Sequence, residues 1–280
     1  MTGAVKSMLT LLNRPEDMGA ILDWAKRLAT DFEAVADAVF LKYDLSADSA
    51  ILADGFGFYA SDAAAREIEE ASAQAEKVAR EAFARAADEA PRLFGDLHVI
   101  PDGLRGGLAR FTRHYDLAVA HLPEGATLIA GETLLAELLL QGGSPVFVAP
   151  RGAPGTAPLD KALVAWDASL EASRALRAAL GLVKRCRSVR LCSIAEKGAR
   201  AIDPDSAARY LRRHGIEAET AVLPPGDRGA GAAILEEAER AGADFIVMGA
   251  FRHSPWREQL FGGATHVVLR GAKKPLLMAH

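Results

Sequence analysis

Cysteine, aromatic residues and long hydrophobic runs are all scarce in this chain. Its 280 residues include two cysteines and 6% aromatic residues, although 50% of the residues are apolar. No apolar run is long enough to span a bilayer, and the chain does not open with a charged, apolar, small-residue leader. We therefore expect a cytoplasmic protein with no membrane segment. With so few aromatic side chains, Ala, Leu and Val must fill the core.

The cysteines and histidines show no pattern of a metal or catalytic site. Cys186 and Cys192 lie in one short stretch, which resembles neither a disulfide framework nor a zinc ligand set, and we expect two buried or half-buried thiols. The histidines have no metal-binding spacing. His253 has no acid or nucleophile at an interpretable spacing. We therefore expect no metal ligand and no catalytic residue.

The two halves of the chain carry opposite net charge. Residues 1–150 contain 13 basic and 23 acidic residues, whereas residues 151–280 contain 20 basic and 14 acidic residues. Opposite halves could attract each other across an interface, and a positive half also suits an anionic ligand. The basic residues are scattered along predicted helices such as 207–214, so we expect no nucleic-acid partner.

The same order of predicted elements occurs twice, as an internal repeat. In the second half the predicted strands are 161–166, 189–194, 217–223, 245–248 and 274–279, and the helices between them are 170–184, 205–214, 232–241 and a short helix after Gly262. In the first half the strands are 7–12, 36–43, 97–101, 116–121 and 145–149, and the helices are 15–32, 61–90, 108–114 and 133–141. A Pro/Gly-rich linker, 151–158, separates the halves. Alternating strands and helices predict right-handed crossovers and parallel sheets.

Glycines cluster around a loop near the end of the chain. A predicted strand ends at Gly249, a polar loop follows, and Gly262 and Gly263 open a short apolar helix that carries Thr265. Glycines let backbone N–H groups approach an anion closely, and a helix N-terminus favours a phosphate group. Turn geometry alone would also account for the glycines.

This segment resembles the carboxy-terminal signature of the universal stress protein family. The family's adenine-nucleotide motif is Gly, two residues, Gly, nine residues, Gly, then Ser or Thr. Gly249 and Gly262 occupy the first and third glycine positions, Arg252 occupies the second, and Gly263 stands in place of Ser or Thr. Thr265 could supply the hydroxyl, and the Arg252 guanidinium could reach a phosphate. A side chain at the second position could instead send the loop along another path.

The resemblance covers nearly the whole chain and implies two tandem doubly wound α/β domains, 1–150 and 159–280. Each would be a five-stranded parallel sheet in order 3-2-1-4-5, with its first and fourth strands adjacent and a crevice at their carboxyl ends. Asp167 and Gly249 would meet at the second crevice, where an acid of the family approaches the nucleoside. Without a ligand, Asp167 could simply help Ser169 to cap the following helix.

The first half lacks the motif. Its first strand ends at Asn13 rather than at an acid, and Gly131 is followed by Glu132. Glu124 and Glu132 would repel a phosphate group. We therefore predict that domain 1–150 is structural and that domain 159–280 alone binds a nucleotide.

The resemblance implies a universal stress protein that binds ATP in its C-terminal domain and acts by regulation rather than catalysis, with at most slow ATP hydrolysis. The two domains would pack as an intramolecular pseudo-dimer through their last strands, and two chains could pair further. Its protein partners are unknown. An alternative is a nucleotide-independent interaction scaffold that uses the acidic helix 61–90. An ATP pyrophosphatase-type ligase would need a Ser-Gly-Gly-rich loop after the first strand, where this chain has Asp167-Ala-Ser-Leu-Glu.

Overall fold

A computed structural model describes residues 5–43, 62–102, 107–122, 128–195, 202–224, 226–251 and 263–280. The strands are β1 (Ser7–Leu12), β2 (Val35–Tyr43), β3 (Phe94–Asp102), β4 (Leu117–His121), β5 (Val146–Ala149), β6 (Lys161–Ala165), β7 (Ser188–Ile194), β8 (Glu219–Leu223), β9 (Phe245–Gly249) and β10 (Leu276–Ala279). The helices are α1 (Met18–Phe32), α3 (Asp62–Glu89), α4 (Gly107–Thr112), α5 (Leu128–Glu137), α6 (Leu170–Val183), α7 (Asp205–Arg213), α8 (Gly229–Arg240) and α10 (Ala264–Gly271). A 3-10 turn η1 (Pro15–Asp17) precedes α1, and a π-helical turn η3 (Leu138–Gly142) follows α5.

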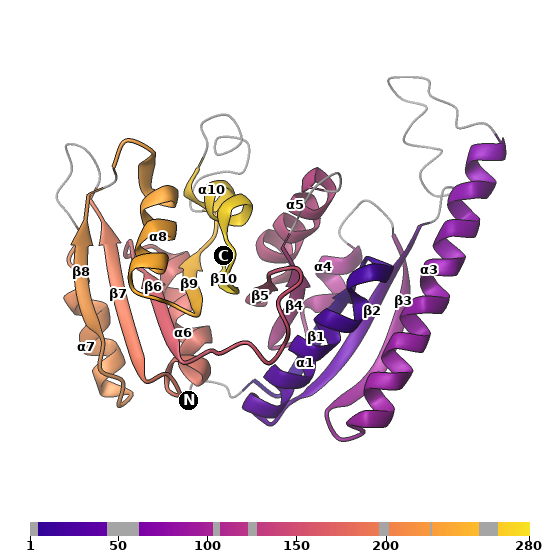
Figure 1. Cartoon of the computed structure of the whole chain (residues 1–280), viewed down its shortest axis with the longest axis horizontal. Helices are drawn as coiled ribbons and strands as arrows, with labels where there is room; N and C mark the ends of the chain where they lie inside the picture. Colours follow the sequence, from indigo (N-terminus) through magenta and orange to yellow (C-terminus); the bar gives the residue numbers. More distant parts are fainter. Residues whose placement is uncertain are drawn as a thin grey trace.

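The strands form one ten-stranded sheet in the order β3-β2-β1-β4-β5-β10-β9-β6-β7-β8 (Figure 1). Within each half the strands pair in parallel and follow the order 3-2-1-4-5. The structure therefore confirms the predicted fold of two doubly wound halves.

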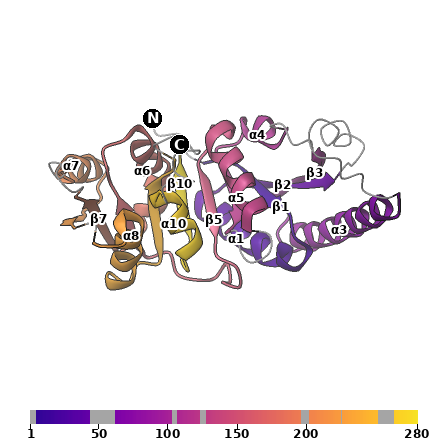
Figure 2. The same ribbon diagram turned by 90° about the horizontal axis from the view of Figure 1, so that it is seen from above.

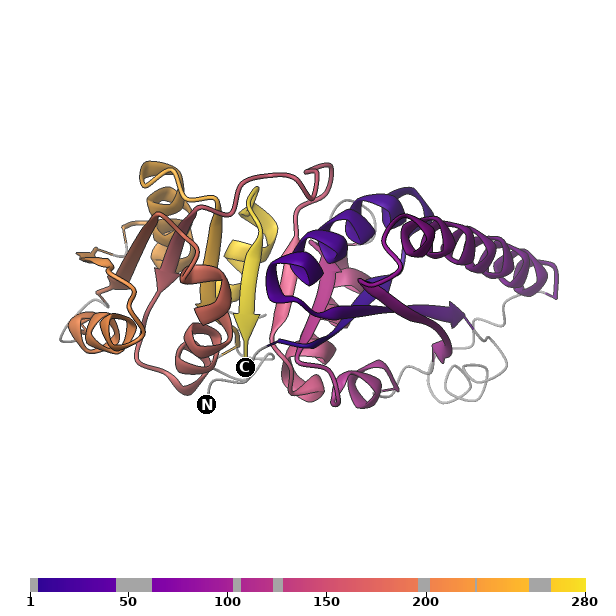
Figure 3. The same ribbon diagram turned by 90° about the horizontal axis from the view of Figure 1, so that it is seen from below.

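The last strands of the two halves join the sheets. β5 and β10 run antiparallel, with Phe147 opposite Leu277 (Figure 3). The segment between β5 and β6 crosses α1, where Trp24 donates its indole N–H to the carbonyl of Ala153 at 3.0 Å. A Cβ at Gly155 would lie 2.5 Å from the Asp23 carbonyl carbon, so this crossing needs a residue without a side chain.

Helices cover both faces of the sheet, as Figure 2 shows from above. One buried cluster lies beneath α1, α3, α6 and α7, and the other lies beneath α4, α5, α8 and α10. Each cluster contains residues of both halves, so the core runs across the junction. The inner strands are apolar at successive positions because side chains that alternate between the two faces are buried on both.

Two predicted helices differ from the structure. The structure divides the predicted helix 133–141 into two parts. Helix α5 starts earlier, at Leu128, and ends at Glu137, and the π-helical turn η3 follows it. The predicted helix 232–241 starts earlier, at Gly229, whose φ is 80°. Apolar periodicity does not reveal either feature, since a π turn shifts the helical repeat and glycine carries no periodic signal.

The part of the chain that the structure describes holds no helix long and apolar enough to cross a membrane.

Candidate functional site

The candidate site lies at the carboxyl ends of the neighbouring strands β6 and β9. These strands are paired in parallel, with Val164 opposite Val247, so the segments that follow them emerge at the same edge of the sheet. Asp167 follows β6, and Gly249 is the last residue of β9. The fold therefore places these two residues at neighbouring strand ends, at the point where the strand order of a doubly wound sheet reverses.

Asp167 begins a tight turn into α6. Its Oδ1 accepts a hydrogen bond from the Ser169 N–H at 3.0 Å, and Ser169 Oγ accepts one from the Ala172 N–H at 3.0 Å. Ser169 is thus the N-cap of α6, as predicted. Between them, Ala168 has a φ of 57°, in the left-handed region that favours glycine. The turn therefore uses one Asp167 oxygen and holds a non-glycine residue in an unfavourable conformation beside the crevice.

Gly249 is needed for close packing. A Cβ at this position would lie 2.6 Å from the Ala172 nitrogen and 2.8 Å from Glu171 Cβ. The end of β9 thus touches the first turn of α6, and any side chain would push the two apart. Gly249 is not among the glycines with positive φ, so the turn-geometry explanation does not apply to it.

The N-cap residue of α10 provides no side-chain cap to this helix. Gly263 is its N-cap, with φ −52° and ψ 153°, and it accepts a backbone hydrogen bond from Val267 at 3.2 Å. The first N–H groups of a helix have no intrahelical partner, and Gly263 has no side chain to satisfy them. They form a partial positive charge suited to an anion.

Thr265 connects α10 to the end of β9. Its Oγ1 accepts a hydrogen bond from the Phe251 N–H at 3.0 Å, and the residue is 4% exposed. Phe251 has a φ of 55°, a second left-handed non-glycine residue at this edge. The Thr265 hydroxyl, which we predicted could supply the hydroxyl of the motif, thus holds Phe251 in place at the start of the glycine loop. Gly262 and Arg252 lie outside the described residues.

In the first half, the protein's own side chains fill the corresponding crevice. His121 pairs with Ala149 as Gly249 pairs with Ala279, so a histidine occupies the place of the glycine. Its ring is buried, with Nε2 3.2 Å from the Asp17 carbonyl oxygen. Burial lowers the pKa of His121 below its usual 6.5, so the ring is neutral at pH 7.

An ion pair adds to this closure. Arg151 forms an ion pair with Asp17 and donates a hydrogen bond from Nε to the Leu122 carbonyl at 2.9 Å. A comparison of the last residue of β4 with that of β9 would have identified His121 as the residue that differs. The partner Arg151 lies in the predicted linker, where no sequence signal marks it.

Glu132 faces the other half of the chain. Its carboxylate accepts hydrogen bonds from Arg270 Nε at 2.7 Å and from a terminal nitrogen of Arg270 at 3.0 Å. These bonds hold the pKa of Glu132 below its usual 4.5. We expected Glu132 to repel a phosphate group, and the structure pairs its carboxylate with Arg270 across the junction.

No metal centre or reactive thiol is found in the described residues. Within the described ranges, no group of three or more His, Cys, Asp or Glu residues could hold a metal ion. Cys186 is half-buried and Cys192 is buried, as predicted, and burial raises the pKa of both thiols to about 12. Such thiols remain protonated and are poor nucleophiles at neutral pH.

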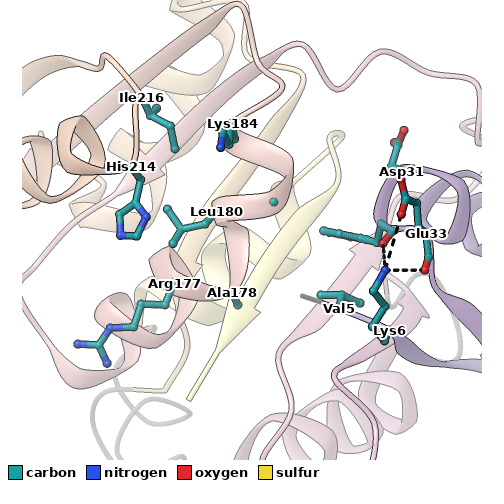
Figure 4. A pocket seen from close by; sticks show the side chains of 12 residues that line it. Val5, Lys6, Asp31, Glu33, Arg177, Ala178, Leu180, Lys184, His214 and Ile216 are labelled. Carbon is teal, nitrogen blue, oxygen red and sulfur yellow. Dashed lines mark hydrogen bonds and ion pairs between the residues drawn. The ribbon is translucent and has the colours of Figure 1, made fainter. Parts of the chain in front are cut away.

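One cavity lined by described residues lies between the halves. It has a volume of about 380 Å³, and Figure 4 shows Lys6 and Glu33 on one wall and Leu180 and His214 on the other. Lys6 Nζ donates a hydrogen bond to the Glu33 carbonyl at 3.0 Å, at the end of α1. A smaller niche of about 170 Å³ lies beside Trp166, between α6 and α7. Neither cavity contains a predicted site residue.

Comparisons with known proteins match the last part of the chain to a family and the whole chain to a fold. Residues 195–280 match the model of the universal stress protein family. A universal stress protein from Archaeoglobus fulgidus DSM 4304 has a TM-score of 0.69 at 20% identity, over 97% of this chain and 95% of that one. A putative universal stress protein from Pseudomonas aeruginosa UCBPP-PA14 has a TM-score of 0.57 at 16% identity, over 99% and 93%.

The same fold also occurs in another class of protein. The cytoplasmic domain of a prokaryotic cation chloride cotransporter has a TM-score of 0.52 at 11% identity, over 98% of this chain and 96% of that one. No curated protein matches the chain in sequence. At these identities the solved structures establish a shared fold, so any function has to be argued from the site.

Proposed function

We propose that the chain is a tandem protein of the universal stress protein type and that its C-terminal domain binds ATP at the carboxyl ends of β6 and β9. The family match of residues 195–280 and the shared fold of the whole chain support this proposal. The observation that carries the proposal is the uncapped N-terminus of α10 at the end of the glycine loop. Backbone N–H groups there would bind phosphate oxygens, and the Asp167 carboxylate at the same edge of the sheet would accept hydrogen bonds from the nucleoside.

The proposed role is regulatory rather than catalytic. Efficient phosphoryl transfer needs groups that neutralise the γ-phosphate and orient a water molecule. Among the described crevice residues, Asp167 holds the turn into α6 and Thr265 holds the start of the glycine loop. A site built in this way would bind the nucleotide and hydrolyse it at most slowly.

The first domain is proposed to be structural. His121 occupies the position of the crevice glycine, and the pair between Asp17 and Arg151 closes the same edge. We therefore expect one ATP per chain. A calorimetric titration that saturates at two nucleotides would contradict this assignment.

Gly263 offers the sharpest test of the phosphate site. Its φ of −52° is one that any residue adopts, so substitution there causes no backbone strain. In Gly263→Asp the carboxylate would cap α10, which keeps or raises the melting temperature, and would exclude phosphate from the same N–H groups. We expect ATP binding to weaken by about thirtyfold or more, or about 2 kcal/mol of charge-assisted hydrogen bonding.

Gly263→Ser is the matched control, because serine caps α10 without a charge and restores the family motif. It should bind ATP at least as tightly as the natural chain. The measurement is ATP titration by calorimetry, with thermal unfolding of all three proteins. Equal affinity in Gly263→Asp would place the nucleotide elsewhere. No heat and no thermal shift in the natural chain at millimolar ATP would end the nucleotide proposal.

A nucleotide-independent scaffold is the second candidate. It is favoured by the packing role of Gly249, because contact with α6 explains this glycine without any ligand. Helix α3 would be the interaction surface, since it lies at the outer end of the first half and carries an exposed face (Figure 1). Partner binding that survives in Gly263→Asp but is lost when the exposed face of α3 is neutralised would support this reading.

A further inference from the structure

Helix α10 is held from the first half of the chain by a buried carboxylate. Glu132 of α5 has a side chain only 10% exposed, and its two oxygens accept two hydrogen bonds from Arg270 of α10. The two helices face each other across the junction in Figures 1 and 2. A bidentate pair with one buried partner restricts both position and orientation more than an exposed ion pair does.

The same carboxylate also faces the first turn of α10. His266 Nδ1 lies 3.9 Å from Glu132 Oε1, and the His266 side chain is 13% exposed. Within the described part of the chain, neither ring nitrogen of His266 has a hydrogen-bond partner. The ring packs edge-on against Phe251 with centroids 5.9 Å apart. Glu132 is therefore linked, through His266 and Phe251, to the start of the glycine loop.

The opposite side of α10 is held by close packing in its own half. A Cβ at Gly231 of α8 would lie 2.9 Å from the Ala264 carbonyl oxygen and 2.7 Å from Val267 Cβ. An eight-residue helix is marginal by itself, so these lateral contacts decide where it lies. α8 provides a contact of fixed shape, and Glu132 provides the polar contact from the other domain.

We infer that Glu132 is a positioning residue through which the first domain sets the nucleotide affinity of the second. The inference rests on the proposed function, because the N–H groups that Glu132 would position are those of the proposed phosphate site. It gives the degenerate first domain a task that needs no ligand of its own. Linkage makes the effect reciprocal, so nucleotide binding should also stabilise the contact between α5 and α10.

An effect of charge alone and an effect of positioning α10 predict different changes in ATP affinity. Glu132→Gln removes a negative charge and Arg270→Gln removes a positive one, so a pure field effect would tighten anion binding in the first variant and weaken it in the second. If the pair positions α10, both variants should weaken ATP binding by a similar factor. The double variant should then be no worse than either single one, because both remove the same contact.

The experiment is ATP titration of the natural chain, both single variants, the double variant and Glu89→Gln. Glu89 forms an exposed pair with Lys26 in the first half, so Glu89→Gln changes the net charge as Glu132→Gln does and controls for it. We expect a loss of affinity of about three- to tenfold in both single variants and the double variant. Glu89→Gln should leave affinity unchanged.

Amide hydrogen exchange adds a readout that a purely structural role would not change. ATP should slow exchange in α5 of the natural chain, and this protection should disappear in Glu132→Gln. Opposite shifts in the two single variants, or unchanged affinity in both, would overturn the inference and leave ATP binding intact. No ATP binding by the natural chain would overturn the inference together with the proposed function.

Discussion

The two crevices of this protein have the same strand order but different residues at the carboxyl end of the fourth strand. In the second half Gly249 lets the first turn of α6 approach β9, so that the backbone of α6 lies where a side chain would otherwise be. In the first half His121 fills the space and contacts the Asp17 carbonyl, and Arg151 pairs with Asp17 beside it. The two strand ends therefore differ in what packs against them: the first turn of α6 at Gly249, and the Asp17 carbonyl together with the pair between Asp17 and Arg151 at His121.

The largest effect is expected when the second crevice is made like the first. Gly249→His would place a Cβ 2.6 Å from the Ala172 nitrogen, and the backbone of α6 cannot move aside as a flexible side chain would. We expect a loss of about 3 kcal/mol in unfolding free energy, measured by denaturant titration. Gly19→His is the control, since a Cβ at Gly19 meets nothing within 4 Å. Equal losses in both would contradict the packing role of Gly249.

The reverse change in the first crevice should cost less. His121→Gly removes a buried ring and its contact with Asp17, leaving a cavity and a more flexible backbone, so we expect a loss of about 1–3 kcal/mol in unfolding free energy. The pair between Asp17 and Arg151 remains. ATP stoichiometry should therefore stay at one per chain, and a rise to two would show that His121 alone closes this crevice.

Lowering the pH should reduce the unfolding free energy of the protein through His121 of the first half. Burial lowers the folded-state pKa of His121 below 6.5, so the unfolded chain takes up a proton first as the pH falls. The neutral ring adds no pH dependence above about pH 6.5, and stability falls as the pH drops below that value. Between pH 7.5 and 5.5 the natural chain should lose more unfolding free energy than His121→Gln. Equal losses would show that His121 titrates normally in the folded protein.

The smallest effect concerns backbone strain beside the second crevice. Ala168 has a φ of 57°, so Ala168→Gly should relieve about 1–2 kcal/mol of strain at the expense of about 0.5–1 kcal/mol of added chain entropy. We expect a net gain of about 0.5 kcal/mol in unfolding free energy. The same change at Ala73, exposed within α3, should instead lose about 1 kcal/mol. A loss at both positions would mean that the Ala168 turn is not strained.

Local patterns were enough to predict most of the fold. The apolar stripe of α1, the Ser169 cap and the apolar strands are short-range signals, and each of them is present in the structure. The division of the predicted helix 133–141 was missed because the π turn at Leu138–Gly142 shifts the helical repeat, which apolar periodicity does not reveal. The role of Gly249 was also missed, since nothing local to the sequence shows that α6 lies against it.

The sequence by itself determined the two-copy α/β organisation and the absence of the glycine motif from the first half, and the family resemblance implied that the strands ending near Asp167 and Gly249 are neighbours. Periodicity and helix caps are properties of neighbouring residues, and parallel pairing brings strand ends to one edge. Only the tertiary structure decided that His121 and Arg151 close the first crevice and that Glu132 reaches Arg270. These contacts join residues far apart in the chain, 138 positions apart for Glu132 and Arg270, so their partners emerge only when the two halves pack.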